Sequence, residues 1–62
     1  VIKHIPEGVE VSTRKTADTE YIFIQNFNKQ SVEMQLPVSE YSIFMGAYDG
    51  TIGAYETVVL KK

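Results

Sequence analysis

The longest apolar run of the sequence, at residues 20–27, constrains the fold more than any other feature; it reads Glu-Tyr-Ile-Phe-Ile-Gln-Asn-Phe. Its β-branched and aromatic residues favour a β-strand, and the Asn-Phe-Asn-Lys at its end indicates a turn. Side chains of a strand alternate between two faces, so Ile22 and Ile24 share one face. The opposite face carries three aromatic side chains, Tyr21, Phe23 and Phe27. Both faces are therefore apolar, and we expect Ile22 and Ile24 to point inward, because Gln25 interrupts the other face.

Further segments alternate between apolar and polar residues, as half-buried strands do. They are residues 8–16, 31–36, 39–45 and 55–61, with a shorter piece at Thr51 and Ile52. A tight connection at residues 17–19 predicts an antiparallel hairpin, Pro37 ends the third strand, and Asp49-Gly50 is a tight-turn dipeptide. No segment has an apolar helical period long enough for a helix of three turns. The sequence predicts an all-β domain, a small antiparallel β-sandwich or open Greek-key barrel of about five to six short strands.

Alternation also assigns faces in the two middle strands. In residues 31–36 the apolar face consists of Val32, Met34 and Leu36. In residues 39–45 one face consists of Tyr41, Ile43 and Met45, and Phe44 lies on the other. We therefore expect Phe44 and Met45 to point in opposite directions.

The length of 62 residues allows one domain near the lower limit for independent folding. Such a chain buries only about 60% of the surface that its unfolded state exposes, and small domains usually need disulfides, metals or partners. The chain has no cysteine and a single histidine, His4, which argues against a disulfide framework and a zinc site. We expect one β domain over residues 1–62, with residues 1–7 as an entering strand or linker, stabilised by another polypeptide.

Charge and hydropathy argue against several kinds of partner. The formal net charge is −2, whereas a protein that binds nucleic-acid phosphates needs a basic face. No apolar run approaches the eighteen or so residues of a transmembrane helix, so we expect no membrane partner. The chain starts at Val1, without an initiator methionine or a signal-peptide core. This start predicts a fragment of a longer protein, with a cytoplasmic location.

The polar residues form no recognisable catalytic or cofactor-binding motif. The eight carboxylates occupy turns or positions that alternate with apolar residues, as solvated surface acids do. The serines lack a partnering histidine in any known triad motif. Phosphate-cradling glycine loops and calcium loops are also missing. We therefore expect no catalytic residue, no metal ligand and no cofactor within these residues.

Three tyrosines remain as candidate sugar contacts: Tyr41, Tyr48 and Tyr55. A tyrosine ring has an apolar face that stacks on a sugar, and its hydroxyl tolerates water. In so small a chain, however, most aromatic residues are also needed for packing. His4 and Arg14 fit surface or interdomain contacts better than they fit ligands.

Four motifs resemble the C-terminal domain of glycoside hydrolase family 42 β-galactosidases. Residues 6–14, Pro-Glu-Gly-Val-Glu-Val-Ser-Thr-Arg, match its proline-glycine turn, its Val-Glu-Val and a nearby arginine. An aromatic-aliphatic strand ending in asparagine follows at residues 21–26, then a Val-x-x-x-Leu-Pro strand at 32–37 and a tyrosine with a valine-rich strand at 55–60. The chain departs from the family where Phe27 replaces a frequent histidine.

The resemblance implies a small antiparallel β domain that follows a TIM-barrel catalytic domain and a middle domain. It places the catalytic glutamates in the barrel, so none of the eight acids here takes those roles. It implies an accessory domain that contacts its own parent catalytic and middle domains, with Tyr21, Phe23 and Phe27 as candidate interdomain contacts. The alternative is an independent carbohydrate-binding module that uses the three tyrosines.

Overall fold

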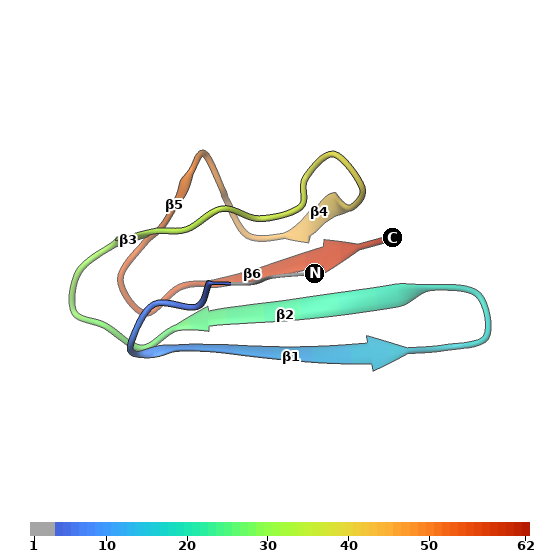
Figure 1. Cartoon of the computed structure of the whole chain (residues 1–62), viewed down its shortest axis with the longest axis horizontal. Helices are drawn as coiled ribbons and strands as arrows, with labels where there is room; N and C mark the ends of the chain where they lie inside the picture. The colour runs from blue at the N-terminus through green and yellow to red at the C-terminus, as the bar shows by residue number, and fades with distance from the viewer. Residues whose placement is uncertain (1–3) are drawn as a thin grey trace.

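Two antiparallel β-sheets form the domain in the computed structural model, which describes residues 4–62 (Figure 1). The larger sheet has the strand order β1-β2-β6-β4, and β3 pairs with β5 in the smaller one. The strands are β1 (Val9–Lys15), β2 (Glu20–Asn26), β3 (Val32–Glu33), β4 (Ser42–Met45), β5 (Thr51–Ile52) and β6 (Thr57–Lys61). The prediction of a small antiparallel all-β fold is confirmed.

Strand β2 is one of the two interior strands of the larger sheet, the other being β6. It pairs with β1 on one side, through the hairpin at residues 16–19, and with β6 on the other. Ile22 lies opposite Leu60 and Ile24 lies opposite Val58 in the ladder with β6. All four of these side chains are at most 2% exposed, which confirms that Ile22 and Ile24 point inward.

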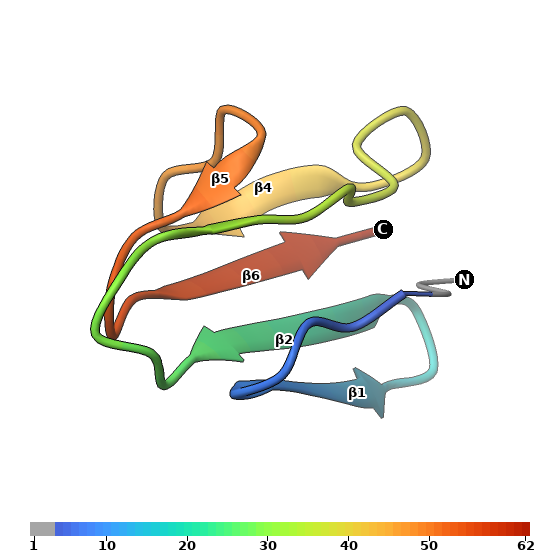
Figure 2. The same cartoon turned by 60° about the vertical axis from the view of Figure 1, so that its left-hand side comes forward.

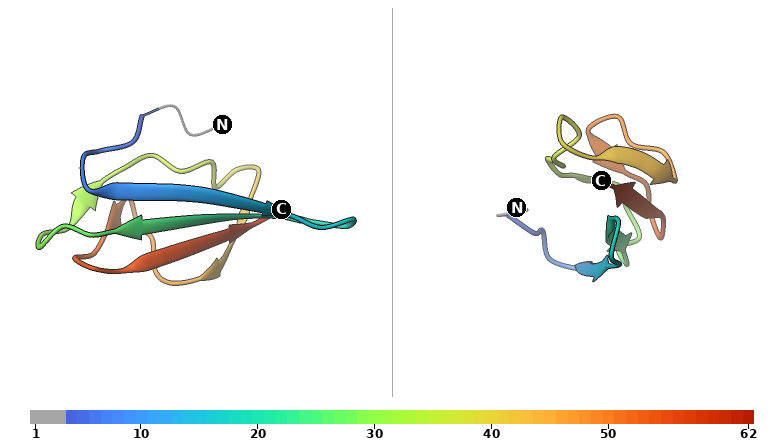
Figure 3. Two further views of the ribbon diagram at one scale, coloured as in Figure 1. Left: turned by 90° about the horizontal axis from the view of Figure 1, so that it is seen from below. Right: turned by 90° about the vertical axis from the view of Figure 1, so that its right-hand side faces the viewer.

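The second layer is mostly irregular chain. Figures 2 and 3 show the segment from β3 to β4 and the β3–β5 pair arching over one face of the larger sheet. From this layer four side chains pack onto the inward residues of the larger sheet, Met34, Leu36, Tyr41 and Ile52. The predicted apolar face of residues 31–36 is therefore confirmed, because Met34 and Leu36 are both buried.

The buried amide of Asn26, at the end of β2, joins the two layers. Its Nδ2 lies 3.1 Å from the Ile52 carbonyl, 3.0 Å from the Gly53 carbonyl and 3.1 Å from the Gln30 carbonyl. Its Oδ1 accepts hydrogen bonds from the backbone N–H and the side-chain amide of Asn28, both at 2.9 Å. Because Asn26 is only 1% exposed, water cannot replace these partners.

Three expected strands are shorter in the structure. The strand expected at residues 31–36 pairs with another strand only at β3. Beyond β3 the Met34 carbonyl and the Leu36 N–H form hydrogen bonds with the hydroxyl of Tyr48 instead of with a neighbouring strand. The strand expected at 39–45 begins at Ser42, because the Pro37 carbonyl accepts hydrogen bonds from the N–H groups of Glu40 and Tyr41 and closes a turn. The last strand begins at Thr57, because Tyr55 has a φ of 59° and lies in a turn.

The face assignment within residues 39–45 was wrong at Met45. The register between β4 and β6 shifts between Ile43, opposite Leu60, and Met45, opposite Val59. Such a β-bulge inserts one residue and breaks the alternation of faces. Tyr41 is buried, whereas Ile43 and Met45 are exposed.

A glycine follows the bulge directly. Gly46 has a φ of 89°, and a Cβ at this position would overlap the carbonyl oxygen of Thr57. Only glycine combines this backbone conformation with so close an approach of two chains. The end of β4 therefore lies tightly against the start of β6.

Residues 1–7 were expected to form an entering strand or linker. Of these, residues 1–3 lie outside the described part of the chain. Residues 4–6 have no regular secondary structure, and Glu7 and Gly8 form a turn in which the N–H of Val9 donates to the Pro6 carbonyl.

We predict that Asn26→Ala lowers the free energy of unfolding by about 2–4 kcal/mol, because buried carbonyls and the Asn28 amide lose their partners. Urea denaturation measures this change. Gln25→Ala is the matched control on the same strand, since Gln25 is exposed, and should stay within about 0.5 kcal/mol of the wild type. An Asn26→Ala protein as stable as this control would contradict the role of the amide.

Candidate functional site

The outer face of the larger sheet, opposite the core, carries a contiguous apolar patch. The ladders place Phe23 beside Val59 and Val59 beside Met45. We call Tyr21, Phe23, Phe44, Met45 and Val59 the outer patch. Val59 is 4% exposed although it does not belong to the core cluster, so its neighbours on the outer face cover it.

The bulge in β4 adds Met45 to this face, opposite Val59, next to Phe44, which shares the face with Ser42 by alternation. The rings of Tyr21 and Phe44 lie 5.5 Å apart between centroids, at an interplanar angle of 65°, which is the edge-to-face geometry that aromatic pairs favour. Phe44 nevertheless remains 53% exposed, and Met45 remains 60% exposed. The outer patch therefore has its largest uncovered area along β4.

Lys61 lies over the aromatic part of the outer patch. Its Nζ is 5.5 Å from the centroid of the Phe44 ring and 6.0 Å from that of the Tyr21 ring. A cation at this distance is attracted by the negative face of an aromatic ring. Arg14 lies opposite Tyr21 in the ladder between β1 and β2, so its side chain projects from the same face.

The three residues expected to make interdomain contacts are arranged as follows. Tyr21 and Phe23 are half-buried members of the outer patch. Phe27 lies just beyond β2, is 53% exposed, and donates its backbone N–H to the Gly8 carbonyl. Sequence reasoning missed Phe44 and Met45, because strict alternation put them on opposite faces. The Gly46 that follows them was the available signal of an irregular strand.

The three candidate sugar-contact tyrosines lie in different environments. Tyr41 is buried, and its hydroxyl donates to Glu20 Oε1 at 3.0 Å. The Tyr48 hydroxyl donates to the Met34 carbonyl at 2.6 Å and accepts from the Leu36 N–H at 3.2 Å. Tyr55 is exposed in its turn. Within residues 4–62, the described contact between aromatic rings is that of Tyr21 with Phe44 rather than one between these tyrosines.

Burial raises the pKa of the Tyr41 hydroxyl above its ordinary value. The hydrogen bond to Glu20 and the negative charges of Glu20 and Glu40 raise the pKa further, because they disfavour a phenolate. The Tyr41 hydroxyl is therefore a donor fixed inside the domain rather than a free group for a ligand.

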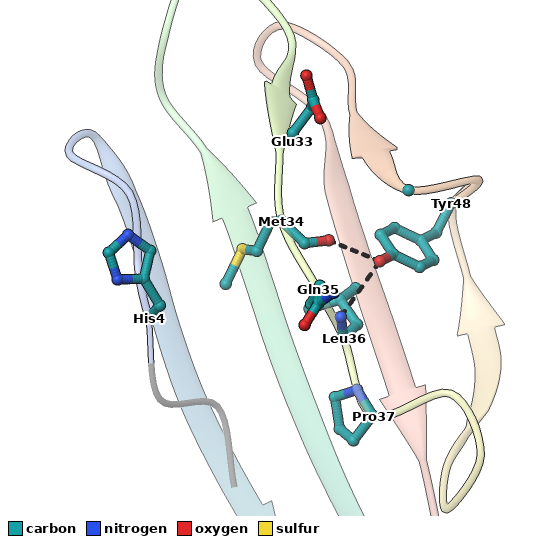
Figure 4. A pocket seen from close by; sticks show the side chains of 8 residues that line it. His4, Glu33, Met34, Gln35, Leu36, Pro37 and Tyr48 are labelled. Atoms are coloured by element: carbon teal, nitrogen blue, oxygen red, sulfur yellow. Dashed lines mark hydrogen bonds between the residues drawn. The ribbon is translucent and has the colours of Figure 1, made fainter.

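An open groove of about 620 Å³ runs beside the extended segment 33–37 (Figure 4). Figure 4 shows His4 and Tyr48 on opposite sides of this segment. The exposed polar side chains of the groove belong to His4, Glu33 and Gln35.

No three His, Cys, Asp or Glu residues are grouped to hold a metal ion in the described part of the chain. Residues 4–62 also contain no helix long and apolar enough to cross a membrane.

Two antiparallel sheets around one core, with an apolar outer face, define a small β-sandwich domain. More particularly, the chain belongs to the β-galactosidase C-terminal domain family of glycoside hydrolase family 42, whose family model matches residues 8–62. This match confirms the resemblance seen in the sequence motifs, and the name of the family points to a β-galactosidase as the parent protein. Comparisons with curated proteins and with solved structures found no match.

We predict that Tyr48→Phe lowers the free energy of unfolding by about 1–3 kcal/mol, because the Met34 carbonyl and the Leu36 N–H lose their shared partner. Tyr55→Phe is the control, since Tyr55 is exposed, and it should leave the stability unchanged in the same urea titration. Equal stabilities of the two variants would contradict a structural role for the Tyr48 hydroxyl.

We also predict that the domain loses stability as the pH rises above the ordinary tyrosine pKa of 10.0. Above this pH the Tyr41 hydroxyl ionises in the unfolded state, whereas in the folded state, where its pKa is raised, it keeps its proton. The free energy of unfolding therefore falls with rising pH until the pH passes the pKa of Tyr41 in the folded state. Urea midpoints measured across this range should fall more steeply for the wild type than for Tyr41→Phe. Parallel pH profiles for the two proteins would refute the coupling.

Proposed function

We propose that this domain is a non-catalytic accessory domain of a β-galactosidase-like glycoside hydrolase, and that it packs against its parent chain through the outer patch. The observation that carries the proposal is the exposure of Phe44 and Met45 beside the Tyr21 and Phe23 side chains. Contiguous exposed apolar surface on a small protein marks an interaction site. The family membership supports the hydrolase parent.

The distribution of carboxylates supports a non-catalytic role. Retaining and inverting glycosidases both need two carboxyl groups that face each other across the scissile bond. Among the eight acids only Glu20 is partly buried, and its carboxylate accepts the hydrogen bond from Tyr41. The other seven are exposed side chains, which fits a solvated surface.

Docking has more support than carbohydrate binding by the tyrosines. The hydroxyls of Tyr41 and Tyr48 already bind partners within the domain, so they are not free to bind a sugar. Carbohydrate binding would have to use the groove at residues 33–37 with His4, or the exposed ring of Tyr55. Titration of galactosides into the labelled protein, followed by NMR, would show shifts at Gln35 or Tyr55 if that alternative held.

We predict that replacing Phe44 and Met45 by serine in the full-length parent weakens docking by about 1.5–3 kcal/mol for each apolar side chain that the contact buries. The melting temperature of the parent should fall, as it should when residues 8–62 are deleted. Val38→Ser is the matched control, because Val38 is 49% exposed and lies outside the outer patch.

This proposal fails if deletion of residues 8–62 leaves both the melting temperature and the oligomeric state of the parent unchanged. It also fails if Val38→Ser lowers the melting temperature as much as the two substitutions in the outer patch do. Differential scanning calorimetry and light scattering of the purified proteins measure the two quantities.

A further inference from the structure

The charged side chains on the outer face lie mainly at one end of it. The row of cross-strand neighbours at that end is Arg14, Tyr21 and Lys61, with Ser42 opposite Lys61 on β4. The next row, which contains Phe23, Val59 and Met45, has no charge. Among the strand residues described on this face the one acid is Glu10, four residues from Arg14 along β1 and so about 13 Å away.

This end of the face is therefore cationic although the whole chain has a net charge of −2. Glu10 is farther from Arg14 than the Debye length of about 8 Å at physiological ionic strength, so it compensates the cations poorly. A partner that contacts this end of the outer patch therefore lies close to the positive charges of Arg14 and Lys61.

The ammonium group of Lys61 lies where a partner that docks on the outer patch would bury its positive charge. Its ammonium group lies over the rings of Tyr21 and Phe44 rather than pointing away from the patch. Any surface that covers these rings also removes water from the ammonium group. Burying an unpaired charge is strongly unfavourable, whereas a buried charge with a counter-ion is tolerated.

From this arrangement we propose that the parent surface covering the outer patch is apolar with one or more carboxylates that pair with Lys61 and Arg14. The inference rests on the proposed docking function and names the chemistry of its partner surface. A second copy of this face fits less well, because two copies would bring together four cations and only two acids. The apolar contacts would supply affinity, and the ion pairs would fix the orientation.

A zero-length carbodiimide cross-linker tests this pairing in the full-length parent, because it joins an amine only to a carboxylate in direct contact. Mass spectrometry of the digest should find Lys61 joined to an aspartate or glutamate of the parent outside residues 8–62. The same cross-link should be absent from Lys61→Arg, which keeps the charge but removes the reactive amine.

Melting of the same full-length proteins gives a second readout. Lys61→Glu should lower the melting temperature, and Lys61→Arg should match the wild type, because it preserves the ion pair. Lys61→Met keeps the apolar stem without the charge and should lie between these two. Lys29→Glu is the control, since Lys29 is exposed in the loop after β2.

Absence of the cross-link together with equal melting of Lys61→Glu and Lys29→Glu would overturn the inference. A cross-link from Lys61 to a second copy of residues 8–62 would overturn it in favour of self-association. Neither result would affect the docking function if deletion of the domain, or the serine substitutions at Phe44 and Met45, still lower the melting temperature.

Discussion

The interior strand β2 has two apolar faces, and the described residues 4–62 place a second layer over only one of them. Ile22 and Ile24 face the core, which the irregular segment after β3 and the β3–β5 pair close from the other side. Within residues 4–62, Tyr21 and Phe23 are half-buried and are flanked on the outer face by their neighbours in the sheet. Small domains bury a modest part of their surface, and disulfides, metals or partners commonly add the stability that the core does not supply.

Side-chain hydrogen bonds shape the covered face of the larger sheet, and a β-bulge shapes the uncovered face. On the covered face the Asn26 amide binds carbonyl groups of the second layer, so a layer with little regular structure is held by side-chain hydrogen bonds. The Tyr48 hydroxyl does the same where the β3–β5 ladder stops. On the uncovered face the bulge in β4 adds Met45 opposite Val59, next to the Phe44 ring that contacts Tyr21, and so enlarges the outer patch. Packing and hydrogen bonding thus fix one face, and the other carries the outer patch through which we propose that the domain docks.

Much of this architecture is predictable from the sequence where the side-chain pattern is regular. The β1–β2 hairpin, the inward Ile22 and Ile24, and the family follow from alternation and from motifs with defined spacing. The short β3, the late start of β4 and the bulge do not, because they depend on contacts between distant residues. The partner of the Leu36 N–H is a tyrosine hydroxyl twelve positions away, and no local pattern reveals it. The outer patch was therefore half predicted: Tyr21 and Phe23 came from alternation, and Phe44 and Met45 needed the structure.

Methionine oxidation in the full-length parent tests the docking of the outer patch most directly. Met45 is 60% exposed in the domain alone, whereas Met34 is 5% exposed and serves as the internal standard for burial. If the parent covers the outer patch, peroxide should oxidise Met45 to the sulfoxide about as slowly as Met34. Rapid oxidation of Met45 in the intact, folded parent, with Met34 still protected, would contradict docking through this face.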